Sequence, residues 1–201
     1  MQRSLMLRSI TGALFGALLV ASPARAELFD ASIGEDSVRI AVSGPLSRLL
    51  AVDKGEYEFG GQFGDIDDYD SEDYFTLHAG ATLRGDAGGN ANTSLTGGLG
   101  ARVQFVSADS EDGGALALGG NATLKLLRAN RLRFNAALWY GPDPASFGDI
   151  DEYLEYSVSV GYEVLRDAEL YVGYRAVEVG LDGGPDVDLE DGAHIGVRLQ
   201  F

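Results

Sequence analysis

The 201 residues carry 31 acidic side chains against 15 basic ones, a formal net charge of −16, and contain no cysteine. A chain this acidic is a poor nucleic-acid binder, because phosphate contacts require clustered Lys and Arg, and without cysteine it has no disulfide framework. Its hydrophobic content of 45% argues against disorder, and its length suits a single domain.

The first 26 residues have the organisation of a secretory signal peptide. Arg3 and Arg8 form a basic start, residues 10–21 are apolar, and Ala24-Arg25-Ala26 is a small-x-small cleavage motif. The apolar run is shorter than the roughly 20 residues that a spanning helix needs. We therefore expect export through the Sec pathway and cleavage after Ala26. The expected mature domain, residues 27–201, keeps 12 basic and 31 acidic residues, a formal net charge of −19.

Near the start of the expected mature domain, two short apolar segments predict a weak hairpin. From Gly55 onward, apolar and polar residues alternate with a period of two, which is typical of strands with two different faces. No segment sustains a helical period. The pattern predicts an antiparallel meander of eight clear strands plus the hairpin, ten in all, and an eight-stranded barrel with a different N-terminal segment is the alternative. The expected strands are Phe29–Ile33 and Val38–Val42 for the hairpin, then segments within 57–63, 75–83, 95–105, 116–126, 132–140, 154–164, 170–174 and 192–201.

The last ten residues form the most informative strand. Their odd-numbered residues are apolar and end in an aromatic side chain, whereas His194, Gly196, Arg198 and Gln200 lie on the opposite face. Such a strand suits a lipid-facing barrel wall with a polar lumen. It also resembles the C-terminal signal by which bacterial outer-membrane barrels are recognised for assembly. We expect the barrel-assembly machinery to read this signal on Ile195, Val197, Leu199 and Phe201.

The connections between strands fall into two classes. If the C-terminus is periplasmic, five outer loops at 34–37, 65–72, 108–113, 141–151 and 181–191 hold 18 acidic residues and no Lys or Arg. Long outer loops, short periplasmic turns and an even strand number are typical of bacterial outer-membrane barrels. The opposite connections include the tight turns 166–167 and 128–130, but 43–53 and 85–93 are longer. Around Pro45, Leu46, Leu49 and Leu50 we expect a helical turn that plugs or caps the periplasmic end.

The composition of the two strand faces decides between a membrane barrel and a soluble sandwich. Nine glycines lie on the polar face, where a narrow lumen would need them, and most aromatic residues lie on the apolar face. We therefore predict an all-β fold, an antiparallel up-and-down transmembrane β-barrel of 8–10 strands with a polar, salt-bridged lumen. Its expected location is the outer membrane of a Gram-negative bacterium. We expect a monomer in contact with membrane lipid and lipopolysaccharide.

Charged residues of both signs fall on the predicted lumen face. Charges confined in a barrel this narrow must pair, because an orphaned buried charge is costly. One interpretation is a narrow ion path whose arginines set selectivity; the favoured one is a salt-bridged plug, given the strand number. The expected luminal charge network comprises Arg39, Glu56, Glu58, Arg84, Arg102, Lys125, Arg131, Arg133, Glu155, Glu163, Glu169, Arg175 and Arg198.

Candidate catalytic and metal-binding residues are few. His78 and His194 both face the predicted lumen, with His194 expected near the outer rim, but no Ser/His/Asp spacing accompanies them. The acidic segment Asp65–Asp73 departs from a calcium-binding EF-hand loop, which needs Gly at position six and Glu at position twelve. Those positions hold Asp70 and Thr76. A solvated loop is the simpler interpretation, and loose divalent binding that bridges lipopolysaccharide phosphates is the alternative. We expect no catalytic residue, cofactor or resident metal.

The expected mature chain resembles the YfaZ family of small outer-membrane proteins. The resemblance covers the N-terminal hairpin, the Tyr/Gly-rich middle strands, the hairpin at Tyr162–Val179 and the closing segment Gly192–Phe201. It implies an outer-membrane β-barrel and brings no established activity or catalytic residues. The expected function is therefore that of a small outer-membrane barrel that is structural or weakly permeable and has no catalytic activity, with its physiological role left open. The alternative is a narrow channel for ions or small solutes.

Overall fold

The computed structural model describes residues 27–66, 72–108, 111–184 and 186–201. The expected signal peptide and most of the segment 65–73 lie outside these residues. No helix in the described part of the chain has the length and apolarity needed to cross a membrane. Within these ranges the elements are β1 (Leu28–Ile33), β2 (Ser37–Pro45), η2 (Leu46–Arg48), β3 (Gly55–Ile66), β4 (Glu72–Asn90), β5 (Thr93–Ala108), β6 (Glu111–Leu126), β7 (Leu132–Gly141), η3 (Asp143–Ala145), β8 (Ser146–Gly148), β9 (Ile150–Leu165), β10 (Ala168–Leu181) and β11 (Asp186–Gln200), where η denotes a 3₁₀ helix.

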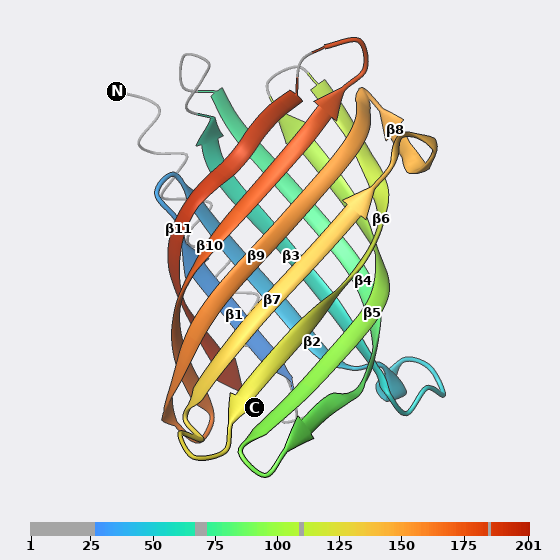
Figure 1. The fold of residues 1–201 in the computed structure, drawn as a ribbon. Helices are drawn as coiled ribbons and strands as arrows, with labels where there is room; N and C mark the ends of the chain where they lie inside the picture. Colours follow the sequence, from blue (N-terminus) through green and yellow to red (C-terminus); the bar gives the residue numbers. More distant parts are fainter. Residues whose placement is uncertain (1–26, 67–71, 109–110, 185) are drawn as a thin grey trace.

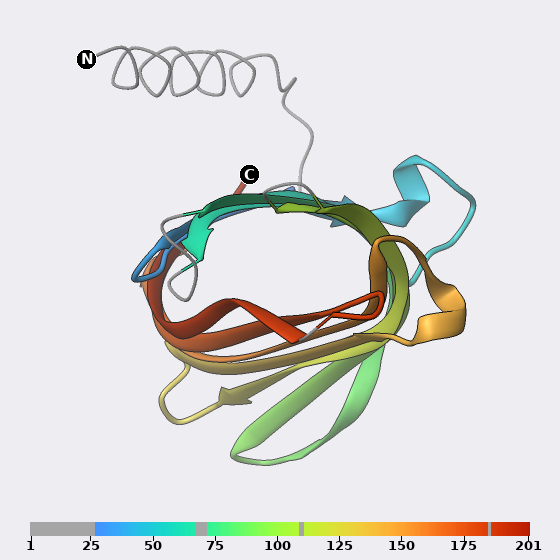
Figure 2. The ribbon, with the colours of Figure 1, turned by 90° about the horizontal axis from the view of Figure 1, so that it is seen from above.

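Ten of these strands form one closed antiparallel barrel, seen from the side in Figure 1 and from above in Figure 2. Neighbours in the barrel are neighbours in sequence, except that β7 pairs with β9 because the three-residue β8 pairs with β6 instead. The barrel closes between β1 and β11, from Leu28 opposite Gln200 to Ile33 opposite Ile195. The prediction of a ten-stranded up-and-down barrel is therefore confirmed. The eight-stranded alternative is wrong, because the weak N-terminal hairpin forms part of the wall.

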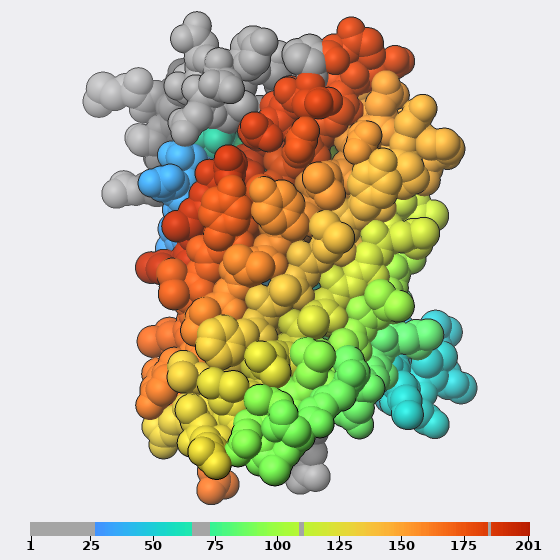
Figure 3. Space-filling model, viewed as in Figure 1, coloured from blue at the N-terminus to red at the C-terminus, as the bar shows by residue number. Residues whose placement is uncertain are grey.

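The two faces of the strands have the polarity of a membrane protein. On β9, Val158 and Val160 point outward and are exposed, whereas Glu155 on the opposite face is only 3% exposed. The same alternation covers β7, β9 and β10, whose side chains form much of the face shown in Figure 3. A soluble protein buries its apolar face and exposes its charges. Here the arrangement is inverted, as lipid on the outside and a polar lumen require.

Near the outer end of the barrel the polarity of the faces reverses. In β10, Val177 and Val179 point inward and are buried, and in β9 Tyr153 is buried while its neighbour Glu152 is exposed. The outward face meets water once a strand leaves the bilayer, so the apolar side chains turn to the inside there. We call the resulting group the apolar layer. It comprises Tyr74, Val106, Ala115, Ala117, Trp139, Ile150, Tyr153, Val177, Val179 and Leu189. The strand pattern of the sequence predicted only charge pairs in the lumen, so this layer was not predicted.

The last outer connection is shorter than expected. The predicted loop 181–191 is mostly strand, because β10 runs to Leu181 and β11 begins at Asp186. Its acidic residues alternate with Val187 and Leu189, so the strand pattern continues through the segment. The pairing shifts by one residue between Val177 and Glu178. Such a bulge hides a strand from a strict period-two pattern.

The two long periplasmic connections have different structures. Residues 85–93 do not form a long loop but continue the β4–β5 hairpin down to a tight turn. There the side chain of Asn90 accepts hydrogen bonds from the backbone N–H groups of Asn92 and Thr93, at 2.8 and 3.1 Å, which is how asparagine stabilises turns. The helical turn expected near Leu46 exists as η2, but it projects away from the ring in Figure 2 and does not plug the lumen.

Candidate functional site

The centre of the lumen is organised around Glu155 of β9. Its two carboxylate oxygens accept hydrogen bonds from Arg39 of β2 and Arg102 of β5, each at 2.7 Å. The hydroxyl of Tyr153 donates a third, also at 2.7 Å. All four side chains are buried or nearly so. One carboxylate therefore joins strands from opposite sides of the barrel.

A second carboxylate, Glu58 of β3, extends this central cluster. It accepts a hydrogen bond from Arg102 at 2.9 Å and lies 3.8 Å from Arg39. Nε2 of His78 lies 3.0 Å from the same carboxylate oxygen. The guanidinium of Arg102 also stacks 4.2 Å from the ring centre of Trp139, a favourable cation–π contact. The planar fork of Arg102 thus pairs with two carboxylates at once and contacts the apolar layer above them.

A separate cluster lies closer to the periplasmic end. Glu169 of β10 pairs with Arg198 at 2.7 Å and with Arg133 at 3.3 Å. Arg198 also donates to Asp30 of β1 at 2.7 Å and stacks 4.0 Å from the ring centre of Tyr171. Arg133 has a second partner in the half-buried Glu163, at 2.7 Å. This periplasmic cluster ties the closing strands β1 and β11 to β10 and β7.

A third contact lies toward the outer end, next to the apolar layer. Arg175 of β10 pairs with Glu190 of β11 at 3.3 Å, and Glu190 also accepts a hydrogen bond from Gln62 at 2.5 Å. Glu190 was counted among the acidic loop residues in the sequence analysis. The structure places it inside the barrel, because β11 begins earlier than expected.

Small residues on the luminal face leave room for these side chains. A Cβ atom at Gly60 would lie 2.7 Å from Nε2 of His78, and one at Gly173 would lie 2.7 Å from Nε2 of His194. Both distances are far below van der Waals contact. The glycines of the polar face therefore have a steric role in the lumen, as the face composition indicated.

Most residues of the expected charge network are in ion pairs. Arg84 pairs with Glu56 at 2.7 Å near the periplasmic mouth. Of the thirteen residues of the expected charge network, only Lys125 and Arg131 have no ion pair with a described residue. Asp30, Glu190 and the three aromatic partners Trp139, Tyr153 and Tyr171 were not among the residues predicted from the sequence. Asp30 could have been found, because it faces away from Phe29, Ala31 and Ile33.

The position of His194 differs from the expectation. It does not lie at the outer rim but midway along β11, opposite Gly173, where it is buried edge-on against the ring of Tyr171. The expected position assumed that residues 181–191 were a loop. Since that segment is mostly strand, every residue after it lies further down the barrel.

Below the central cluster the lumen contains a polar cavity of about 390 Å³. Its outer end is lined by Trp139, Arg102 and Glu155, and its other lining residues include Lys125 and Arg198 near the periplasmic ends of their strands. Seven basic and four acidic side chains line it. We call it the periplasmic chamber, after the side of the membrane that the sequence predicts for this end of the barrel.

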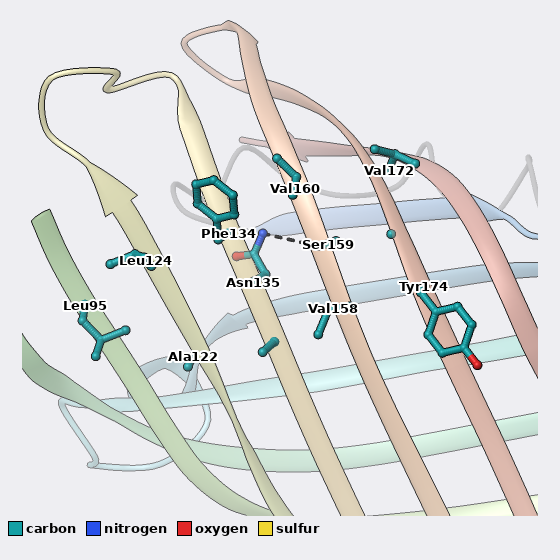
Figure 4. A pocket seen from close by; sticks show the side chains of 12 residues that line it. Leu95, Ala122, Leu124, Phe134, Asn135, Val158, Ser159, Val160, Val172 and Tyr174 are labelled. Atoms are coloured by element: carbon teal, nitrogen blue, oxygen red, sulfur yellow. Dashed lines mark hydrogen bonds between the residues drawn. The ribbon is translucent and has the colours of Figure 1, made fainter.

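A second, apolar hollow of about 570 Å³ lies on the outer face of the wall, over β5, β6, β7, β9 and β10 (Figure 4). Leu95, Phe134 and Tyr174 surround it, and the small side chain of Ala122 lies at its floor. In Figure 4 the dashed line marks the hydrogen bond from Asn135 to Ser159, 3.5 Å long, on the luminal side of the same wall. The hollow belongs to the apolar face and suits a lipid acyl chain.

The outer rim is acidic but holds no ready metal site among the described residues, where no three His, Asp or Glu side chains are grouped to hold an ion. Above the outward apolar run of β9, partial desolvation and the carboxylates of Asp182 and Asp143 raise the pKa of Asp151. Desolvation and two further carboxylates, Asp188 and Asp186, likewise raise the pKa of Glu178. Crowding of like charge is therefore a property of this rim.

Comparisons with known proteins identify one matching family and several similar solved structures. A family model described as "YfaZ precursor" matches residues 7–201. Similar solved structures are the outer membrane protease OmpT from Escherichia coli (TM-score 0.47, 11% identity, 90% of this chain and 98% of that chain), the outer membrane channel DcaP of Acinetobacter baumannii (0.36, 9%, 90% and 60%) and the translocator domain of the autotransporter NalP from Neisseria meningitidis (0.33, 11%, 99% and 96%). No curated protein matches the chain.

Proposed function

The chain belongs to the YfaZ family, and on that premise we propose that it is a structural outer-membrane barrel that neither catalyses a reaction nor conducts solutes. The observation that carries the proposal is the filling of the lumen. Arg102 and Glu155 meet at 2.7 Å in the central cluster, and the buried rings of Trp139 and Tyr153 belong to the apolar layer. Small barrels are only wide enough for their interior side chains. Two stacked layers of this kind oppose the passage of ions.

The surroundings of the two histidines support the absence of catalysis. His78 is engaged by Glu58 inside the central cluster, and His194 is buried against Tyr171. A nucleophile activated by a histidine base needs a hydroxyl or thiol within hydrogen-bond reach of the ring. In the part of the chain that the structure describes, neither histidine hydrogen-bonds a serine or threonine hydroxyl.

One observation favours the alternative, a narrow channel for ions or small solutes. The periplasmic chamber is lined by more basic than acidic side chains, and rings of Arg and Lys are typical of anion pores. A channel would also need a path through the central cluster and the apolar layer. Both layers are built from buried side chains, which favours the sealed barrel over the channel.

We predict that the protein is electrically silent in planar lipid bilayers, with no discrete conductance steps. Insertion is verified on the same samples by heat-modifiable migration of the folded form on gels. The double variant Trp139→Ala, Tyr153→Ala removes two of the three aromatic rings of the apolar layer and is expected to conduct. Discrete steps from the unmodified protein would overturn the proposal. A silent double variant would contradict the role assigned to the apolar layer.

The location and partners follow from the same proposal. We propose that residues 1–26 direct export and that the barrel is a monomer in contact with membrane lipid and lipopolysaccharide. In β11 the exposed Ile195 points outward and the terminal Phe201 is also exposed. Together with Val197 and Leu199 these residues fit the assembly signal predicted from the sequence, which the barrel-assembly machinery would read.

A further inference from the structure

The periplasmic chamber has an excess of positive charge that is concentrated on one wall. On the β1–β3 and β10–β11 side, each arginine that lines the chamber has a carboxylate partner, and Arg198 has two, Asp30 and Glu169, each at 2.7 Å. On the β6–β7 side, the side chain of Lys125 makes no ion pair or hydrogen bond with any described residue, although it lines the chamber. The uncompensated charge therefore lies on this wall.

Lys125 faces a second cation directly. It is paired in register with Arg133 of β7, and both side chains line the chamber. Like charges directly opposite each other on neighbouring strands destabilise a sheet. The terminal nitrogens of Arg133 are held by Glu163 and Glu169, but its Nε is buried without a hydrogen-bond partner. That nitrogen is closed off from the chamber, so the guanidinium of Arg133 adds positive charge beside Lys125 without offering its Nε to a ligand.

Neutral polar side chains lie on the next rung of the same wall. Thr96, Thr123 and Asn135 are consecutive partners across β5, β6 and β7, and all three line the chamber. The hydroxyl of Thr123 donates to the amide oxygen of Asn135 at 2.9 Å. Hydroxyl and amide groups next to two cations are the groups that bind a polar solute carrying one anionic end.

We propose that the periplasmic chamber binds a small soluble organic anion, carrying a phosphate or carboxylate group, that enters from the periplasm. Lys125 binds the anionic group with the positive charge of Arg133 beside it, and Thr96 and Asn135 contact its hydroxyl groups. The chamber volume of about 390 Å³ is within the range of small-molecule sites. The inference goes beyond the proposed structural role and does not depend on it, because a chamber can bind an anion whether or not the lumen is sealed above it.

Binding can be measured by calorimetry on the full chain, refolded in non-ionic detergent in a phosphate-free buffer. The probes are glucose 6-phosphate and citrate, with glucose as the neutral control. We expect saturable binding of the anions, no binding of glucose, and an affinity about tenfold or more weaker in Lys125→Gln. Arg131→Gln is the matched control, because Arg131 lies at the same end of the barrel without lining the chamber. It is expected to bind within about twofold of the unmodified protein.

Three outcomes would overturn the proposal: no saturable binding of either anion, equal binding of glucose, or equal losses in Lys125→Gln and Arg131→Gln. Lys125→Met provides a second variant if Lys125→Gln fails to fold. The same titration in nanodiscs of phosphatidylcholine, with and without phosphatidylglycerol, separates a soluble ligand from a lipid headgroup. Unchanged affinity supports the soluble anion, whereas competition by phosphatidylglycerol would assign the chamber to a lipid and refute the proposal. Conductance plays no part in these readouts, so the two proposals fail independently.

Discussion

Val158→Arg is expected to lower the free energy of unfolding in lipid vesicles by about 2–4 kcal/mol. Val158 lies near the middle of β9, points outward and is 54% exposed in the isolated chain. In a bilayer this exposed surface meets hydrocarbon, where a guanidinium loses its hydration. Unfolding by guanidinium chloride can be followed by the fluorescence of Trp139, the only tryptophan of the chain.

The matched control is Leu165→Arg on the same strand. Leu165 is the last residue of β9, at the periplasmic end, and is 69% exposed. An arginine near the membrane interface is expected to cost no more than about 1 kcal/mol. If the protein were a soluble sandwich, both substitutions would replace exposed side chains and change stability by less than about 0.5 kcal/mol. Equal and small effects at the two positions would therefore refute the assignment of the lipid-facing surface.

Glu155→Gln is expected to destabilise the barrel by about 3–5 kcal/mol, because it leaves Arg39 and Arg102 buried with too little compensating charge. Both guanidinium groups donate to Glu155 at 2.7 Å, and Gln lacks the negative charge that holds them. The measurement is the same unfolding transition. Arg39→Gln combined with Glu155→Gln restores the balance of charge and is expected to recover part of the loss.

Glu163→Gln is the control for this experiment. Glu163 also pairs with an arginine at 2.7 Å, but it is partly exposed, and Arg133 keeps Glu169 as a partner. The expected cost is below about 1 kcal/mol, as for solvent-exposed pairs. A loss at Glu155 no larger than the loss at Glu163, or no recovery in the double variant, would contradict the central place given to Glu155.

The faces of the strands could be predicted from the sequence because a strand has an unambiguous period. In β9 every second residue from Leu154 to Val164 is apolar, and the intervening residues all point into the lumen. The partners of the charges could not be predicted. Arg39 lies 116 residues from Glu155, and Arg102 lies 53 residues from it. Pairing across a barrel depends on strand stagger and closure, which local patterns do not contain.

The outer end was harder to predict for a different physical reason. The alternation of apolar and polar residues indicates that Val177 and Glu178 lie on opposite faces of the strand. It does not indicate at which residue the strand leaves the bilayer, beyond which the apolar side chains point into the lumen. The bulge at Leu189 in β11 then obscured the strand that continues through Glu190. As a result the apolar layer was missed, and Glu190 was assigned to a solvated loop instead of to Arg175.

The whole account depends on a barrel that crosses the outer membrane with its acidic rim outside and its chamber facing the periplasm. The chain has no cysteine, so single-cysteine variants can be labelled without background. Asp182→Cys lies in the β10–β11 turn and Ala91→Cys in the β4–β5 turn, and both positions are exposed. With a polymer-linked maleimide too large for porins, we expect intact cells to label Asp182→Cys, and Ala91→Cys to label only after the outer membrane is opened. Labelling of Ala91→Cys on intact cells, or an unlabelled protein in the soluble periplasmic fraction, would contradict the account.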